Sequence, residues 1–405
     1  MSLNDTPSAN RTHIGIFGRR NAGKSSVINA LTGQSLAIVS EIKGTTTDPV
    51  LKAMELLPLG PVVMIDTPGL DDEGELGQLR IQKAYQILNK TDIAILVVDG
   101  LVGLTTDDTQ ILEHIKKKQI PYLIVMNKMD LLSQITDRSA VSSNQLLESS
   151  EPYIWVSTTT GANIQELKEL IAKQVLPDPS KYPIVKDLLK PADFVILVIP
   201  IDKAAPKGRL ILPQQQTIRD ILEADAISIV VSVSQLSHTL KTLGTKPRLV
   251  ITDSQAFSAV AAVTPNDIAL TSFSILFARH KGSLETVVKG AKALDTLNDG
   301  DTILICEGCT HHRQCEDIGT VKLPLMIRKH TGKELNFQFT SGVEFPVALS
   351  SYKMIVHCGG CTLNEREMKY RIQCAIDSET PITNYGIAIA HMQGILKRSI
   401  EPLRL

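Results

Sequence analysis

The strongest constraint on the fold is a short glycine-containing segment near the start of the chain. Gly18 and Gly23 enclose four residues and are followed at once by Lys24 and Ser25. The apolar run HIGIF precedes the segment, and the helix-forming run SSVINALTG overlaps its end. A strand that turns through glycines into a helix is the setting of a P-loop, whose backbone N–H groups face phosphate oxygens. The segment predicts an α/β nucleotide-binding domain, with Lys24 on the β- and γ-phosphates and the Ser25 hydroxyl on Mg²⁺.

Residues for the Mg²⁺ ion and the γ-phosphate follow in the order that such a domain needs. Asp66 comes directly after the apolar run VVMI, and its carboxylate is expected to hold the Mg²⁺ shell. Gly69 is expected to sense the γ-phosphate. Between these residues and the P-loop lies a run of threonines, in which Thr46 is the first choice and Thr47 the second for closing on Mg²⁺ when a triphosphate is bound.

A third group of residues predicts which base is bound. Asn127, Lys128 and Asp130 follow the apolar run YLIVM, whereas Ser157 and Thr158 follow the run YIWV and would support the base. A carboxylate in this place accepts hydrogen bonds from the N1–H and the 2-amino group of guanine. Adenine has neither donor, so it would leave the acceptor unpaired. The sequence therefore predicts selectivity for GTP.

Together these five segments resemble the translation-factor-related GTPases, most of all the subgroup with the tRNA-modifying GTPase MnmE and Era. The resemblance implies a slow GTPase domain with a defined set of nucleotide contacts. The residues expected to bind the nucleotide are Gly18, Asn21, Ala22, Gly23, Lys24, Ser25, Ser26, Thr46, Asp66, Gly69, Asn127, Lys128, Asp130, Ser157 and Thr158. Those expected to act in catalysis are Lys24, Thr46, Asp66 and Gly69, with Ser25 and Thr46 as Mg²⁺ ligands.

Two positions refine the expected hydrolysis. Leu70 stands where Ras-like enzymes carry the glutamine that orients the attacking water, so intrinsic hydrolysis should be slow or should use another group. Asn21 lies inside the P-loop, where the MnmE-like subgroup uses an asparagine to help bind K⁺. The resemblance thus implies K⁺-stimulated hydrolysis, while the alternative role of Asn21 is that of a turn residue with a tolerant backbone.

The apolar runs divide the chain into three α/β blocks. Residues 1–177 alternate short apolar runs with amphipathic ones, which is typical of βα units around a mostly parallel sheet. The stretch LPDPSKYPIVKDLLKP holds four prolines and is predicted to be a linker. The βα rhythm then resumes over residues 178–265 as a small second domain, and residues 266–405 form a third block that contains every cysteine.

Composition excludes several classes of protein. The 42 Lys and Arg residues balance 43 Asp and Glu residues without a long run of either sign, which argues against a nucleic-acid surface. No stretch reaches the ~18 apolar residues that a membrane span needs, and the N-terminus lacks an apolar signal region. We therefore expect a cytoplasmic protein.

All six cysteines lie in the last quarter of the chain, at positions Cys306, Cys309, Cys315, Cys358, Cys361 and Cys374. Clustered cysteines in a cytosolic chain indicate metal binding or redox chemistry rather than disulfides. The pairs 306/309 and 358/361 each follow an apolar strand, and their spacing fits an iron–sulfur cluster or a zinc ribbon equally well.

A sharper pattern separates these two readings. Cys309-x-His311, together with His357-Cys358-x-x-Cys361, resembles the iron–sulfur signature of the maturation GTPases of [FeFe]-hydrogenase, the HydF family. The resemblance covers essentially the whole chain. It implies a [4Fe–4S] cluster held by Cys309, Cys358 and Cys361, with His311 or His357 as a possible fourth ligand or as a hydrogen-bond donor beside the cluster. Cys306 and Cys315 are alternate ligands, and the other interpretation of Cys306 is a small apolar residue that ends a buried strand. Cys374 is expected in the core.

The same resemblance implies a function. The protein would be a scaffold or carrier for the precursor of the two-iron subcluster of [FeFe]-hydrogenase, its cargo. It would receive this precursor with help from radical-SAM maturases and pass it to apo-hydrogenase. Residues 178–265 would be a dimerisation domain that makes a homodimer, and residues 266–405 the iron–sulfur domain.

Two alternatives remain open. One is an Era- or MnmE-like RNA- or ribosome-associated GTPase in which the cysteines hold a structural zinc ion, although the neutral charge counts against an RNA partner. The other is a radical-SAM or redox enzyme, which the absence of Cys-x3-Cys-x2-Cys disfavours.

Overall fold

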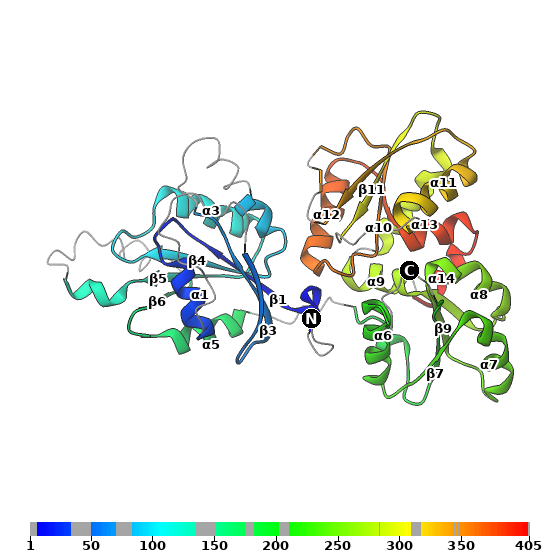
Figure 1. The fold of residues 1–405 in the computed structure, drawn as a ribbon, viewed down its shortest axis with the longest axis horizontal. Coiled ribbons are helices and arrows are strands. Elements are labelled where there is room, and N and C mark those ends of the chain that lie inside the picture. The colour runs from blue at the N-terminus through cyan, green and yellow to red at the C-terminus, as the bar shows by residue number, and fades with distance from the viewer. Residues whose placement is uncertain are drawn as a thin grey trace. The chain divides into compact units, whose positions relative to one another are not determined.

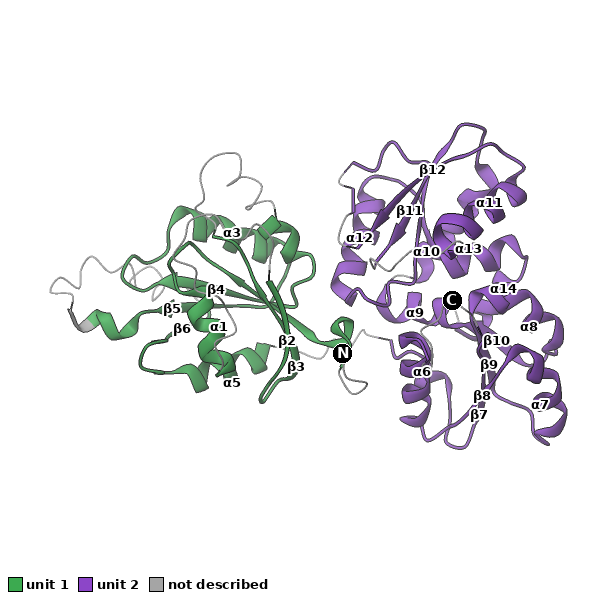
Figure 2. Cartoon of the chain, viewed as in Figure 1, with its two compact units in different colours: residues 1–178 green, residues 179–405 purple. Residues whose placement is uncertain are grey.

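The computed structural model of the chain describes residues 6–33, 50–69, 83–134, 151–174, 182–201, 210–282, 284–308, 317–342, 345–346 and 348–403. These residues belong to two compact units, 1–178 and 179–405, which are coloured separately in Figure 2. Each unit is built from largely parallel sheets covered by helices, which confirms the α/β class. Within the described ranges, no helix is both long and apolar enough to cross a membrane.

The first unit is a six-stranded sheet in the order β2-β3-β1-β4-β5-β6. Only β2 runs antiparallel to its neighbour. The strands are β1 (Thr12–Phe17), β2 (Val50–Leu56), β3 (Gly60–Asp66), β4 (Ile93–Asp99), β5 (Tyr122–Asn127) and β6 (Tyr153–Trp155). The helices are α1 (Lys24–Thr32), α3 (Thr106–Lys117) and α5 (Ile164–Gln174).

Both faces of this sheet are buried, which is why its central strands read as unbroken apolar runs. On β4, Ile95 packs with α1 and α5 on one face. Its neighbour Leu96 packs with α3 on the other face, as the placing of these helices in Figure 1 shows. The parallel strands all end at one edge of the sheet, so the residues that follow them are brought together there.

The second sheet, in the order β10-β9-β7-β8, is entirely parallel. Its strands are β7 (Phe194–Val198), β8 (Ile227–Val231), β9 (Leu249–Thr252) and β10 (Ala269–Ser272). Its helices are α6 (Leu212–Leu222), α7 (Leu236–Thr242), α8 (Phe257–Val263) and α9 (Phe273–Lys281).

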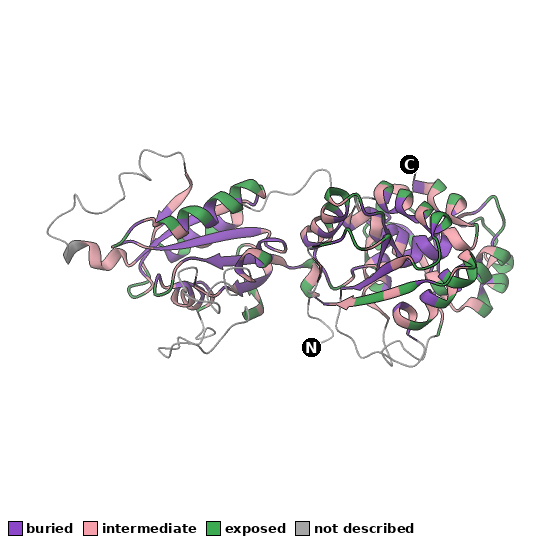
Figure 3. Cartoon of the chain, turned by 90° about the horizontal axis from the view of Figure 1, so that it is seen from above, coloured by how far each residue is buried: buried purple, intermediate pink, exposed green. Residues whose placement is uncertain are grey.

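The third sheet, in the order β12-β11-β13-β14, is also parallel. Its strands are β11 (Thr302–Glu307), β12 (Asn336–Ser341), β13 (Met354–His357) and β14 (Ile382–Asn384). The helices of this part are α10 (Leu284–Ala291), α11 (Leu323–Thr331), α12 (Glu365–Asp377), α13 (Tyr385–Met392) and α14 (Leu396–Ile400), with the 3₁₀ turn η7 (Lys292–Thr296) and the π-helical turn η8 (Ile318–Lys322). Strands β11, β13 and β14 are largely buried, whereas the edge strand β12 is exposed or half-buried, and Figure 3 shows this mixture of buried and exposed strands.

Helix α10 contributes Leu284, Val287 and Ala291 to the core of the second sheet, and this sheet continues past residue 265, where the second block was predicted to end. Strand β10 pairs with β9, so the sheet extends to Ser272. After the last strand of the third sheet, the chain returns to the second sheet. Its C-terminal residues Leu396, Ile400 and Leu403 pack into the core of the second sheet. Arg398 holds this C-terminal segment against the second sheet by donating from Nη2 to the carbonyl of Thr264 over 2.8 Å. Such pairing between distant segments leaves no mark in local composition. Local composition was the only indication of the boundary that could be taken from the sequence.

Candidate functional site

The loop after β1 has the backbone that a phosphate cradle needs. Gly18 and Gly23 have φ values of +137° and +95°, which favour glycine. A Cβ on Gly18 would lie 2.1 Å from the carbonyl oxygen of Val97, and one on Gly23 would lie 2.2 Å from Nδ2 of Asn127. Both glycines are therefore required by space as well as by conformation. Asn21 also has a positive φ, +61°, a conformation that asparagine tolerates better than most residues.

The predicted phosphate and Mg²⁺ groups meet at the start of α1. Lys24 donates from Nζ to the carbonyls of Gly18 and Arg19 over 2.9 and 2.7 Å, so its charge lies within the loop. The Ser25 hydroxyl donates to Oδ2 of Asp66 over 3.0 Å. Burial raises the pKa of Asp66, and the Ser25 hydrogen bond and the Lys24 charge oppose this rise. A hydroxyl and a carboxylate at this separation are oxygen ligands of the kind that Mg²⁺ takes.

The base-recognition residues form a connected group at the ends of β5 and β6. Buried Asn127 donates from Nδ2 to the carbonyl of Ala22 over 3.1 Å and accepts from the backbone N–H of Thr158 over 3.4 Å. The Ser157 hydroxyl donates to Oδ1 of Asp130 over 2.6 Å. Asn127 thus joins the P-loop to the base loop, and Ser157 orients the Asp130 carboxylate.

One residue of this group was missed from the sequence. Asp99, the last residue of β4, accepts from Lys128 Nζ over 2.5 Å and pairs with its charge. The signal was present, because Asp99 ends a buried apolar strand at the same sheet edge as Asp66. Thr46, Thr47 and Leu70 lie outside the described residues, and Gly69 is the last described residue before one of the gaps.

The second predicted site lies where β11 and β13 end side by side. The Sγ atom of Cys358 accepts backbone N–H groups from Gly308 over 3.1 Å and from Gly360 over 3.4 Å. Such donors favour the thiolate, which is the form that binds metal. Cys361 is half-buried in the same turn. Cys309 directly follows Gly308 in the sequence, and it lies outside the described residues together with His311 and Cys315.

Two other cysteines have surroundings that differ from those of this turn. Cys306 is fully buried within β11, and burial raises the pKa of its thiol to about 11, so it packs as an apolar residue. Cys374 on α12 is half-buried and packs against the core that Cys306 helps to form.

His357 has both ring nitrogens engaged within the protein. Nδ1 lies 2.7 Å from the carbonyl of Cys358, and Nε2 lies 3.1 Å from Nη1 of Arg371. Arg371 can only donate, so Nε2 accepts and Nδ1 carries the proton. Burial, together with the charge of Arg371, lowers the pKa of His357 to about 3 and keeps the ring neutral. In this arrangement His357 holds the backbone at Cys358, and neither ring nitrogen offers a lone pair.

The group that holds His357 is itself a buried ion pair. Arg371, fully buried on α12, donates from Nε to Oε1 of Glu367 over 2.9 Å and from Nη2 to the carbonyl of Gly342 over 2.7 Å. These contacts have no sign in the sequence, because a charged residue in a helix is ordinarily expected to be exposed.

A buried lysine supports the turn on its other side. Lys281, at the end of α9, donates from Nζ to the carbonyls of Gly360, Cys361 and Leu363 over 3.3, 3.4 and 2.9 Å. A pocket beside this contact is lined by Lys281, Cys358 and apolar residues that include Phe277 and Met368. Lys281 thus places a positive charge against the Cys361 turn from a helix that belongs to the second sheet.

Three family models match consecutive parts of the chain. Residues 13–128 match the 50S ribosome-binding GTPase model. Residues 184–282 match the hydrogen maturase F dimerization domain, and residues 285–402 match the hydrogen maturase F tetramerization domain. The two hydrogen maturase F models together cover more than half of the chain.

Curated relatives match the GTPase part. A tRNA modification GTPase MnmE of Nitrosomonas eutropha is 35% identical over 161 residues, which are 40% of this chain and 34% of the relative. A GTPase Era of a Nostoc species is 31% identical over 172 residues, which are 42% of this chain and 53% of the relative. The chain therefore spans about a third to a half of the length of these relatives. Among solved structures, Era in complex with MgGDPNP and ribosomal RNA has a TM-score of 0.37 at 21% identity, over 57% of this chain and 98% of that one.

Proposed function

Because the chain belongs to the hydrogen maturase F family and carries a GTPase domain, we propose that it hydrolyses GTP to support the maturation of [FeFe]-hydrogenase. It would act in the cytoplasm as a scaffold that holds a [4Fe–4S] cluster and the precursor of the two-iron subcluster. The precursor would come with help from radical-SAM maturases and would pass to apo-hydrogenase. The contacts around Cys358 are the observation that carries the cluster part of this proposal.

The nucleotide site has the groups that hydrolysis needs. Lys24 would leave the loop carbonyls and donate to the β- and γ-phosphates, and Ser25 and Asp66 would face Mg²⁺. Thr46 and Gly69 would respond to the γ-phosphate. With Leu70 in place of a water-orienting glutamine, turnover would be slow, and Asn21 would help a K⁺ ion to offset the developing charge.

Asp130 would select the base. Its carboxylate is held by the Ser157 hydroxyl and would accept from the N1–H and 2-amino groups of guanine. Lys128 and Asp99 form an ion pair beside it, and Asn127 fixes the P-loop to the loop that carries Thr158. A nucleotide that binds would therefore contact loops already joined to one another.

Cys309, Cys358 and Cys361 would hold the cluster. The donor set fits: Cys358 Sγ accepts two N–H groups, and Lys281 lies at the Cys361 turn, so negative charge is favoured on both sides. A cluster with three thiolate ligands leaves one iron able to take a ligand from an incoming metal complex. His357 would position Cys358, and His311 would be an exchangeable fourth ligand of that iron or a hydrogen-bond donor beside the cluster.

The family models bear on assembly. A homodimer was expected, and the dimerization model at residues 184–282 supports one. The tetramerization model covers the part that was predicted only as an iron–sulfur domain, so the cluster region also carries an oligomerisation function. A tetramer built as a dimer of dimers follows from having both domains in one chain.

Metal analysis tests the proposal. The protein, purified without oxygen, should be brown, carry about four irons per chain and give an EPR signal when reduced. Cys358→Ala should lose most of the iron and the signal, whereas the matched variant Cys374→Ala should keep both. A colourless protein with one zinc per chain would instead favour the GTPase with a structural zinc site. A full EPR signal in Cys358→Ala would refute the ligand assignment.

A further inference from the structure

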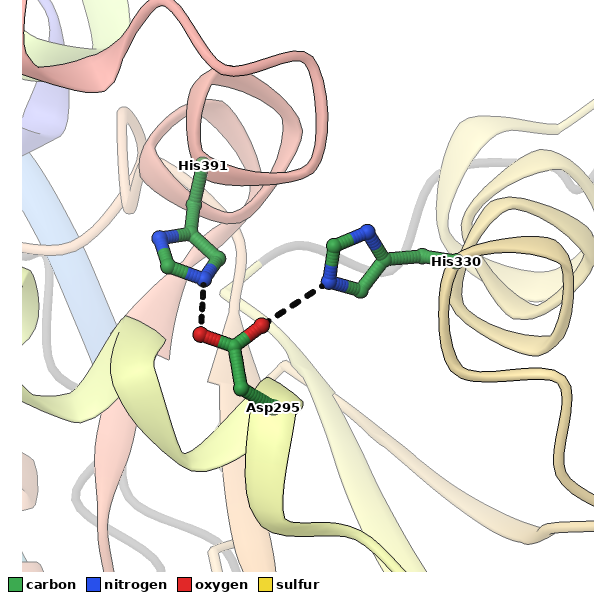
Figure 4. Close-up of side chains that lie close together, drawn as sticks. All are labelled: Asp295, His330 and His391. Atoms are coloured by element: carbon green, nitrogen blue, oxygen red, sulfur yellow. Dashed lines mark hydrogen bonds and ion pairs between the residues drawn. The ribbon is translucent and has the colours of Figure 1, made fainter.

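A second group of metal-binding side chains lies away from the cysteine turn. Asp295 on η7, His330 on α11 and His391 on α13 point toward one another in Figure 4. Nε2 of His330 lies 3.0 Å from Oδ1 of Asp295, and Nε2 of His391 lies 2.9 Å from Oδ2 of the same carboxylate. The donor atoms of all three residues lie within 4.8 Å of one another.

These distances suit a single metal ion. Zinc is bound by imidazole nitrogen and carboxylate oxygen at about 2.0–2.2 Å, so ligand atoms on one tetrahedral ion are roughly 3.3 Å apart. The two nitrogen–oxygen separations, 3.0 and 2.9 Å, differ from this value by a few tenths of an ångström, and all the donor atoms lie within 4.8 Å of one another. Each Nε2 now donates its N–H to the carboxylate. To bind the ion, Nε2 would release that proton and offer its lone pair, and the neutral ring would carry its proton on Nδ1 instead.

The three residues are held in place by the core beneath them. Leu294, Ile327 and Ala388 are fully buried in the core between the third sheet and its helices. Asp295 directly follows Leu294 in the chain. His330 comes three residues after Ile327 on α11, and His391 comes three residues after Ala388 on α13. Each histidine therefore lies on the same face of its helix as the buried residue, at the rim of that core. A site whose backbone is fixed by packing is preorganised for its ligand.

The surroundings favour a cation. His330 and His391 both lie in the last turn of their helices, where the helix dipole places partial negative charge. The Asp295 carboxylate adds negative charge between the two imidazoles. The side chains of His330, His391 and Asp295 are 26%, 19% and 51% exposed, which leaves a path for an ion to enter.

We propose that Asp295, His330 and His391 form a site for one divalent transition-metal ion, with Zn²⁺ as its natural occupant. The mixed imidazole and carboxylate set suits Zn²⁺ and its first-row neighbours, and it differs from the thiolate set of the cysteine turn. Three protein ligands leave one position for water or another ligand. The bound ion links η7, α11 and α13, and so clamps the helices that cover one face of the third sheet. This site is independent of the proposed GTPase and scaffold function.

The test counts metal in the full-length chain. To remove competition from thiolates, Cys309, Cys358 and Cys361 are changed to alanine, and the protein is stripped with a chelator and titrated with Zn²⁺ alone. One Zn²⁺ should bind per chain and raise the melting temperature. In this background Asp295→Asn, which keeps the size of the side chain, and His391→Gln should abolish both effects. His238→Gln, at an exposed histidine on α7, is the matched control and should retain both.

Cobalt binding provides a second test that does not depend on replacing the cysteines. Co²⁺ added to the otherwise unaltered protein should give visible d–d bands that His391→Gln weakens and His238→Gln leaves unchanged, with far-UV circular dichroism confirming that each variant is folded. Stoichiometry and spectra that are equal in all variants would overturn the proposal. So would a protein that binds no Zn²⁺, because the three residues would then be joined by hydrogen bonds only.

Discussion

Replacing Arg371 by methionine should destabilise the second unit strongly. The guanidinium donates to the Glu367 carboxylate, the Gly342 carbonyl and Nε2 of His357, and its side chain is fully buried. Methionine fills a similar volume but donates to none of these groups. Removing one partner of a buried ion pair costs about 3–5 kcal/mol, because the remaining charge is left uncompensated. We expect Arg371→Met to lower the free energy of unfolding by that amount.

The composition of the chain provides a convenient assay. Trp155 is the only tryptophan, and it lies on β6 of the first unit. Its fluorescence during urea unfolding therefore reports on the first unit, whereas far-UV circular dichroism reports on both. With a urea m value of about 2–3 kcal/mol/M, the circular dichroism midpoint of the second unit should fall by about 1–2 M. The Trp155 transition should stay where it is.

Two further variants separate the ion pair from a general effect of mutation on α12. Glu367→Gln in the Arg371→Met background should recover part of the loss, because it removes the unpaired carboxylate charge. Lys369→Met breaks the exposed pair with Glu365 on the same helix and should cost less than about 1 kcal/mol. If Arg371→Met shifts the transition no further than Lys369→Met does, the buried network is not what holds this part of the fold.

Three other outcomes follow from the sites. Asp130→Asn should weaken GDP binding about 100-fold, because about 3 kcal/mol of charge-assisted hydrogen bonding to guanine is lost. Titration calorimetry measures this affinity, and an unchanged value would contradict the base assignment. GTP turnover should rise when K⁺ replaces Na⁺ in the natural chain but not in Asn21→Ala, and equal rates in both salts would count against a K⁺ site. Lys281→Met should lower the reduction potential of the cluster in an EPR-monitored titration, because a positive charge beside an anionic cluster is lost. Lys281→Arg, which keeps the charge, should restore the potential. Equal potentials in the natural chain and both variants would exclude an electrostatic role for Lys281.

The candidate nucleotide residues could be placed in the fold from the sequence because each lies at the end of a local apolar run. Asp66, Asn127 and Ser157 each follow an apolar strand, so identifying the strand also places the residue at the carboxyl edge of the sheet. Parallel topology then brings these edges together without further information. Asp99 obeys the same rule and was missed only because no known motif contains it.

The support of the cysteine turn could not be predicted in this way. Lys281 and Arg371 act on the turn from helices α9 and α12, and their partners are mostly backbone carbonyls, which have no sequence signature. The boundary near residue 265 has no local signature for a related reason: β10 looks like any apolar strand, and only its pairing with β9 assigns it to the second sheet. Contacts between distant segments depend on the packed fold and not on local pattern.

The return of α14 to the second sheet has a consequence for synthesis of the protein. Strand β7 begins at Phe194, yet Leu403 completes the core around it, roughly 200 residues later in the chain. At about 5–20 residues per second, a ribosome needs about 10–40 s to cover that distance. The first unit can fold early, while the nascent second sheet waits with part of its apolar surface uncovered. Slower growth or chaperone supply during expression should therefore raise the yield of folded protein by protecting the second unit.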